Sequence, residues 1–158
     1  MRATFSKVLL DHAMTDKRII LLTGDLGYVM WDEFQHLLPD QYYNVGASEQ
    51  AMMDIAVGLA YSGKIPVVYS ITPFLLYRPF ETIRTYIDHE KLNVKLIGSG
   101  RSDDYKHDGY SHNADDECGI LRQLPNIVQM YPQKKDDIPY ITEQALKDTR
   151  PVFISLKR

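Results

Sequence analysis

A single carboxylate at the start of an otherwise apolar helix is the strongest sign of chemistry in this chain. Glu49 follows the segment 44–48 and stands in the first turn of a helix predicted over residues 48–62. Apolar residues recur at three- and four-residue steps along the rest of this helix, so one face is expected to be buried. The first turn favours negative charge, because unpaired backbone N–H groups lie there. Spacing alone leaves open whether Glu49 only helps to start the helix or has a chemical role.

A polar loop predicted over residues 98–116 contains the next candidates. Its two histidines, His107 and His112, lack the spacing of the common zinc motif, and no thiolate lies nearby. The acidic residues also do not follow the calcium-loop pattern. We therefore expect no metal site in this chain. Because long polar loops in compact domains are usually functional, Asp108 and His112 are expected to handle a substrate.

The composition narrows the class of protein. A chain of 158 residues with 44% hydrophobic and 25% charged residues is typical of one globular domain with its own core. The net charge of −3, without a basic run, argues against a nucleic-acid partner. Cys118 is the only cysteine, so a reducing cytoplasm is the expected location. We expect neither a signal peptide nor a membrane partner, because no apolar run is long enough.

Predicted helices and strands alternate along the chain. Short apolar runs predict strands at residues 18–23, 42–45, 65–71, 94–97, 126–130 and 152–155. Helices are predicted at 3–14, 31–38, 48–62, 74–89, 117–121 and 136–147. This order predicts an α/β fold: a three-layer, doubly wound, mostly parallel sheet with helices on both faces.

The expected fold brings the candidate residues together. Ligands of such sheets bind beyond the carboxyl ends of the strands. Asp25, Glu49, Phe74 and the 98–116 loop each follow a predicted strand. We therefore expect them at one edge of the sheet.

Five motifs resemble a known family over essentially the whole chain. They are residues 23–27, 44–50 with 58–60, 72–74 with 78–81, 108–113, and 121–126. In this order and at these separations they resemble the pyrimidine-binding domain of transketolases. That domain is related to deoxyxylulose-phosphate synthase and to the beta chains of 2-oxo-acid dehydrogenases. The resemblance implies the thiamine-diphosphate-binding fold and thiamine diphosphate as the cofactor.

The resemblance implies a catalytic and cofactor-binding role for Glu49. The matching glutamate hydrogen-bonds the pyrimidine nitrogen N1′ of the cofactor. A proton shared there favours the imino form, whose N4′ removes the proton from thiazolium C2. A carboxylate suits this role because burial can shift its pKa. The cofactor performs the bond chemistry, and the protein supplies orientation and proton transfer.

Four further residues match cofactor-binding positions. Phe74 matches the aromatic residue that stacks on the pyrimidine. Tyr77 is its rival, because the segment up to Arg78 is one residue longer than in deoxyxylulose-phosphate synthase. Arg78 is assigned to the same cofactor site, and Asp25 matches an aspartate near the thiazolium end. The alternatives are ordinary core packing for the two aromatic residues and a turn at a strand end for Asp25.

Three residues match substrate-binding positions of transketolases. Asp108 and His112 match residues that hold the hydroxyls and carbonyl oxygen of the donor ketose, so His112 is also a catalytic candidate. Arg158 matches an arginine on the substrate phosphate. The usual Thr-His-Gln reads Ser-His-Asn at residues 111–113, and residues 106–107 replace expected glycines. We expect these departures to affect the specificity for the donor ketose more than the type of reaction.

The resemblance also implies a partner. Transketolases carry a diphosphate-binding domain and a third domain besides this one, and neither is expected within residues 1–158. The Gly-Asp-Gly motif that anchors Mg²⁺ and diphosphate does not occur in this sequence. We therefore expect a single domain that works with a larger diphosphate-binding subunit, which supplies the Mg²⁺ ligands. A heterotetramer with two copies of each chain is expected, since closed two-fold symmetry is common.

The expected reaction transfers a two-carbon ketol unit from a ketose, phosphorylated or nucleotide-linked, to an aldehyde acceptor such as an aldose. One alternative is a 2-oxo-acid decarboxylase or deoxyxylulose-phosphate-synthase-like activity on the same cofactor. A second is a non-catalytic subunit kept for assembly. A third is a receiver or flavodoxin-like module, since doubly wound sheets host many functions. The acids and lysine that receivers need at their strand ends are not visible in this sequence.

Overall fold

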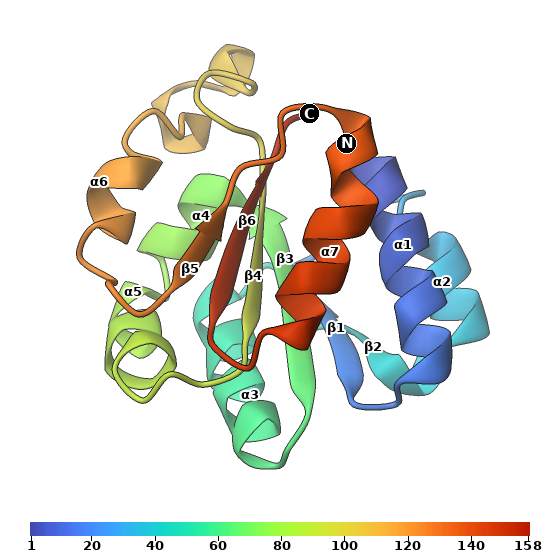
Figure 1. Ribbon diagram of the computed structural model, residues 1–158. Helices are drawn as coiled ribbons and strands as arrows, with labels where there is room; N and C mark the ends of the chain where they lie inside the picture. The colour runs from blue at the N-terminus through green and yellow to red at the C-terminus, as the bar shows by residue number, and fades with distance from the viewer.

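The computed structural model describes residues 1–158 and contains one sheet of six strands (Figure 1). The strands are β1 (Ile19–Thr23), β2 (Tyr42–Asn44), β3 (Ile65–Ile71), β4 (Lys95–Ser99), β5 (Val128–Met130) and β6 (Val152–Leu156). Their order in the sheet is β2-β1-β3-β4-β6-β5, and every neighbouring pair is parallel. The predicted α/β fold is confirmed, and the sheet is wholly rather than mostly parallel.

Helices cover both faces of this sheet (Figure 1). One face carries α1 (Arg2–Thr15), α2 (Asp32–Leu37) and α7 (Ile138–Lys147). The other carries α3 (Glu49–Tyr61), α4 (Thr72–Tyr77), α5 (Phe80–Thr82) and α6 (Glu117–Leu121). Shorter turns are η1 (Pro39–Gln41), η2 (Ile83–Asp88), η3 (Lys106–Asp108), η4 (Tyr110–His112) and η5 (Lys135–Asp137). The predicted three layers are therefore present. None of the helices is both long and apolar enough to cross a membrane.

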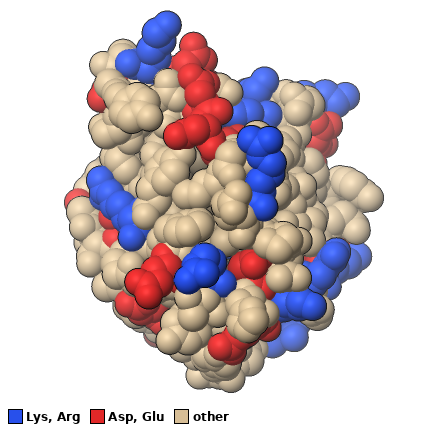
Figure 2. Space-filling model, turned by 90° about the vertical axis from the view of Figure 1, so that its left-hand side faces the viewer, with Lys and Arg blue, Asp and Glu red and all other residues tan.

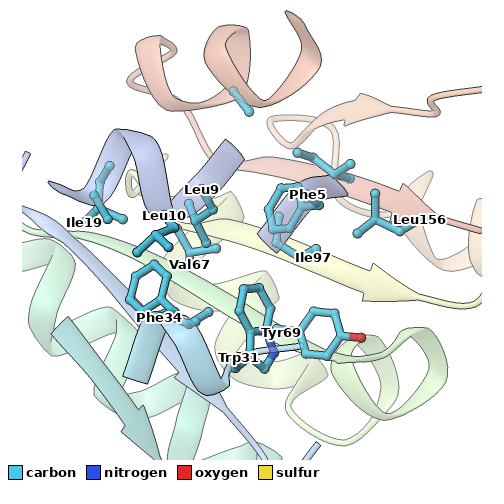
Figure 3. Close-up of a cluster of buried hydrophobic side chains, with 14 of the residues drawn as sticks. Phe5, Leu9, Leu10, Ile19, Trp31, Phe34, Val67, Tyr69, Ile97 and Leu156 are labelled. Carbon is cyan, nitrogen blue, oxygen red and sulfur yellow. The ribbon is translucent and has the colours of Figure 1, made fainter. Parts of the chain in front are cut away.

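Two hydrophobic clusters, one on each face, hold the layers together. Strand β1 contributes to both, because its successive side chains point to opposite faces: Ile19 and Leu21 to one, Ile20 and Leu22 to the other. On the α1 face, Trp31 lies edge-on to the rings of three neighbours: Phe5, Phe34 and Tyr69 (Figure 3). Burial on both faces explains why the strands are nearly continuous apolar runs.

The structure differs most from the sequence-based prediction at residues 74–89, where one continuous helix is expected. The chain forms α4, α5 and the π-helical turn η2 instead of one continuous helix. Helix α4 begins at Thr72, with Pro73 in its first turn, where proline is well tolerated. Pro79 then interrupts the helical hydrogen bonds, because it has no backbone N–H. The break places Arg78 at the C-terminal end of α4.

The predicted loop after the fourth strand begins later than expected. Strand β4 extends to Ser99, because it pairs with β3 on one side and β6 on the other. The segment 100–116, called here the 100–116 loop, contains η3, η4 and an isolated antiparallel bridge between Ser102 and Ala114. The other predicted elements are present, with ends that differ by at most two residues.

Candidate active site

Glu49 is the first residue of α3, and it is 3% exposed. It packs at the end of β1, where Gly24 leaves room: a Cβ atom there would lie 3.7 Å from Glu49 Oε1. The buried side of α3 is formed by Met52, Met53, Ala56 and Val57, which join the core of that face. The helix predicted from the apolar steps is confirmed, but its buried face is rotated: Met52 and Ala56 are buried as expected, whereas Ala51 and Ile55 are exposed. The buried side fixes the Glu49 carboxylate at the carboxyl edge of the sheet.

The side chain of Arg78 joins Glu49 to Phe74. Arg78 Nη1 donates a hydrogen bond of 2.7 Å to Glu49 Oε2 and forms an ion pair with it. Its guanidinium carbon lies 3.7 Å from the centroid of the Phe74 ring. The three predicted residues therefore form one contiguous group of carboxylate, planar cation and aromatic ring.

His112 reaches this group from the 100–116 loop. Its ring meets that of Phe74 edge-on, with centroids 4.8 Å apart. Ser111 Oγ lies 3.0 Å from His112 Nδ1, and the Tyr105 ring lies 6.4 Å from the His112 ring. Residues far apart in the sequence, Glu49 and His112, thus belong to the same side-chain group.

Asp25 is held rigidly just after β1. It has a left-handed backbone conformation, with φ of 59°. Its N–H donates to Asn44 Oδ1 at 2.9 Å, while Tyr28 Oη and Asn44 Nδ2 donate to Asp25 Oδ1. The hydrogen bond from Tyr28, followed by that from Asn44, holds the pKa of Asp25 below its usual value. The carboxylate therefore stays ionised in an exposed position at the carboxyl edge.

Asp108 and Arg158 meet through a residue that the sequence analysis did not assign to the site. His107 Nε2 lies 3.2 Å from Asp108 Oδ2 and 3.4 Å from Arg158 Nη1. The N–H of Arg158 donates to Asp104 Oδ2, and its guanidinium lies 5.2 Å from the Tyr105 ring centroid. His107 replaces an expected glycine, and this departure from the family pattern is the sequence feature that could have pointed to His107 as a site residue. The two predicted substrate residues are therefore brought together.

Tyr77 lies in a different environment from Phe74. It borders a cleft of about 250 Å³ that is lined by Pro73, Tyr77, Tyr110, Ser111, Asn113 and Asp116. Burial, followed by hydrogen bonding to the Asp116 carboxylate, raises the pKa of Tyr77. Phe74 contacts Arg78 and His112, whereas Tyr77 contacts Asp116.

A buried polar network anchors the 100–116 loop and was not predicted. Arg101 Nε donates to Ser155 Oγ at 3.1 Å, and Ser155 Oγ donates to Glu117 Oε1 at 3.1 Å. Arg101 Nη2 also donates to the carbonyl oxygen of Pro132 at 3.1 Å. Burial raises the pKa of Glu117 to about 7. In the sequence, the only indication of this network is Ser155, a polar residue inside an otherwise apolar final strand.

The surface charge is mixed. On the face shown in Figure 2, Lys and Arg side chains are interspersed with Asp and Glu. No group of three or more His, Cys, Asp and Glu residues is arranged to hold a metal ion. Cys118 is a free, exposed thiol.

The fold and the grouped side chains define a ligand-binding domain of the doubly wound α/β class. Residues 1–158 match the family model of the transketolase pyrimidine-binding domain, and the chain belongs to this family.

Three similar proteins illustrate the relationship. The 6-deoxy-6-sulfo-D-fructose transketolase subunit SqwH of Clostridium sp. is 30% identical over 100% of this chain and 49% of its own length. One of the subunits of apulose-4-phosphate transketolase from Actinobacillus succinogenes is 32% identical over 75% of this chain and 38% of its own. A solved split-gene transketolase, an inactive β4 tetramer, is 30% identical with a TM-score of 0.87, covering 99% of this chain and 51% of its own. The chain thus spans about half or less of these proteins.

Proposed function

We propose that this chain is the pyrimidine-binding subunit of a split transketolase-like enzyme that uses thiamine diphosphate. The enzyme would transfer a two-carbon ketol unit from a ketose donor to an aldehyde acceptor, and only together with a partner subunit. The observation that carries this proposal is the buried Glu49 carboxylate, grouped with Phe74 and His112 at the carboxyl edge of the sheet. Family membership supports the choice of cofactor.

The residues fit the pyrimidine half of the cofactor. Glu49 offers a buried acceptor, Phe74 offers an aromatic face, and both contact the same planar group of Arg78. Thiamine diphosphate, when bound, supplies the nucleophilic carbon that takes up the ketol unit. We assign Glu49 to holding or releasing a proton at pyrimidine N1′, Phe74 to stacking, and Asp25 to the thiazolium end. Tyr77, in its separate cleft, is assigned a supporting role next to this site.

One substrate residue, His112, belongs to this group. The other two, Asp108 and Arg158, both lie within reach of His107. His112, edge-on to Phe74, is assigned to the donor's carbonyl oxygen, and Asp108 to its hydroxyls. Arg158, with His107 between it and Asp108, is assigned to an anionic group of the substrate. The names of two relatives refer to a sulfo sugar and a sugar phosphate. These names support a substrate with an anionic group. The proposed donor is a phosphorylated or nucleotide-linked ketose.

A diphosphate-binding partner is part of the proposal. The chain covers about half of the solved split-gene transketolase, which is described as an inactive β4 tetramer. We assign the Mg²⁺ and diphosphate ligands to the partner, and we propose a heterotetramer with two copies of each chain in the cytoplasm. The free thiol of Cys118 suits a reducing compartment.

Reconstitution tests this proposal. The chain is combined with the diphosphate-binding subunit, thiamine diphosphate and Mg²⁺, and ketose donors are compared with pyruvate in the presence of aldoses. Ketol transfer that requires both chains would support the proposal. Turnover of pyruvate alone would favour the decarboxylase or deoxyxylulose-phosphate-synthase alternative. Full activity of the partner alone would favour the assembly-subunit alternative, and ketose turnover by this chain alone would contradict partner dependence.

A further inference from the structure

The guanidinium of Arg78 makes both contacts that the proposed function requires of the cofactor's pyrimidine. It donates to the Glu49 carboxylate at 2.7 Å and lies 3.7 Å above the Phe74 ring. A guanidinium is planar and delocalised, so it stacks on aromatic rings and hydrogen-bonds carboxylates in the same plane. An aminopyrimidine protonated at N1′ has the same two properties: a flat ring and an N–H donor in its plane.

The exposed fractions of the two side chains show which of them faces solvent. The Glu49 side chain is 3% exposed, whereas the Arg78 side chain is 47% exposed. Arg78 is therefore the solvent-facing member of the pair, and Glu49 Oε2 lies beneath it. A planar ligand that stacks on this face of Phe74 and bonds to this oxygen would have to take the position of the guanidinium.

We propose that Arg78 is a placeholder for the cofactor's aminopyrimidine, and that its side chain must leave Glu49 and Phe74 before the cofactor can bind. The inference rests on the proposed function and adds to it a role for Arg78 in cofactor affinity. Arg78 keeps the carboxylate and the ring in the arrangement that the pyrimidine needs. It also satisfies a buried charge that would be costly to leave unpaired.

The exchange is feasible because each lost contact is replaced. The pyrimidine N1′ donor takes over from Arg78 at Glu49, and the pyrimidine ring takes over at Phe74. Arg78 itself is half exposed and lies at the end of α4, directly before Pro79, so its side chain can turn into solvent. The half-exposed guanidinium returns to water when it leaves, and a single cation–π contact at such a position is weak, so the exchange costs Arg78 little.

The affinity of the two-chain complex for thiamine diphosphate tests this inference. The direction in which the Kd changes distinguishes a placeholder from a cofactor ligand. Thiamine diphosphate with Mg²⁺ is titrated by calorimetry into the complex of this chain with the diphosphate-binding subunit. Arg78→Met keeps much of the apolar stem and removes the guanidinium. It should tighten the Kd about three- to tenfold, the combined size of one half-exposed ion pair and one cation–π contact. Arg84→Met is the matched control, because Arg84 is an exposed arginine of the nearby turn η2, and it should leave the Kd unchanged.

Arg78→Lys gives a second measurement if the methionine variant fails to fold. Lysine keeps the charge but lacks the planar group that stacks on Phe74, so a smaller tightening of the same sign is expected. A weaker Kd in the folded variants would make Arg78 a direct cofactor ligand, and an unchanged Kd would show that it does not compete; either result overturns the inference. If the wild-type complex bound no thiamine diphosphate, the proposed function would fail first and this inference with it.

Discussion

Replacing Glu117 with glutamine measures what it costs to ionise a carboxyl group beneath the 100–116 loop. Glu117 is 4% exposed and accepts a hydrogen bond from Ser155, which in turn accepts one from Arg101. Burial raises the pKa of Glu117 from 4.5 to about 7. At about 1.4 kcal/mol for each pKa unit, this corresponds to about 3 to 4 kcal/mol. Glutamine has the same shape, can still accept from Ser155, and does not ionise.

The sign of the effect follows from proton binding. Between pH 4.5 and about 7 the folded chain holds the Glu117 proton more tightly than the unfolded chain does. The free energy of unfolding therefore falls as the pH rises through this window, and the contribution of Glu117 is fully present only below pH 4.5. The free energy of unfolding of the glutamine variant does not fall in this way, because glutamine does not ionise. Relative to wild type, it should gain about 2 to 3 kcal/mol between pH 5 and pH 8.

Urea unfolding of both proteins at several pH values measures this difference. Subtracting the two curves removes the groups that titrate equally in both, including Lys95, whose pKa burial lowers to about 7. A flat difference for Glu117→Gln, or one that falls with rising pH, would refute the reasoning.

Two further predictions concern the cofactor site and the sheet. Phe74→Ala should weaken thiamine diphosphate binding to the two-chain complex at least severalfold, because it removes the stacking ring. Tyr77→Phe should change this binding little. Equal effects of the two variants in a titration would contradict the assignment of Phe74 as the stacking residue. Gly98→Ala should destabilise the chain by about 1 to 3 kcal/mol in urea, because its Cβ would lie 2.5 Å from Thr72 Oγ1. Gly58→Ala, with nothing within 4 Å, should stabilise α3 by up to about 1 kcal/mol, and a reversed order would count against the packing described.

The sequence predicted the fold well because its signals are local. Apolar runs such as Ile19–Thr23 indicate strands buried on both faces, and the three- and four-residue steps after Glu49 indicate the helix α3. The helix at 74–89 was predicted too long, since the apolar pattern continues across Pro79 while the backbone hydrogen bonds do not. The missing backbone N–H of Pro79, rather than the apolar pattern, determines where this helix is interrupted.

The site was predicted residue by residue but not as a set of contacts. Glu49, Phe74, Arg78 and His112 were named, and they form one group. Nothing in the sequence placed the Arg78 guanidinium between Glu49 and Phe74, because that contact depends on where α4 ends. In the sequence, His107 stands out only as a metal-ligand candidate without zinc spacing and as a departure from a family motif, although it links Asp108 to Arg158. Such contacts depend on tertiary geometry, which residue types alone do not specify.

Proton exchange at C2 of thiamine diphosphate tests the role of Glu49 most directly. In the two-chain complex, the rate at which this proton exchanges with deuterium can be followed by quenched-flow NMR. Glu49→Gln should slow the exchange and turnover by about 10²–10⁴, the usual range for a proton-transfer group, while the exposed control Glu81→Gln should change neither. Near-wild-type exchange in the Glu49→Gln complex would contradict the central claim that this carboxylate acts on the cofactor's pyrimidine.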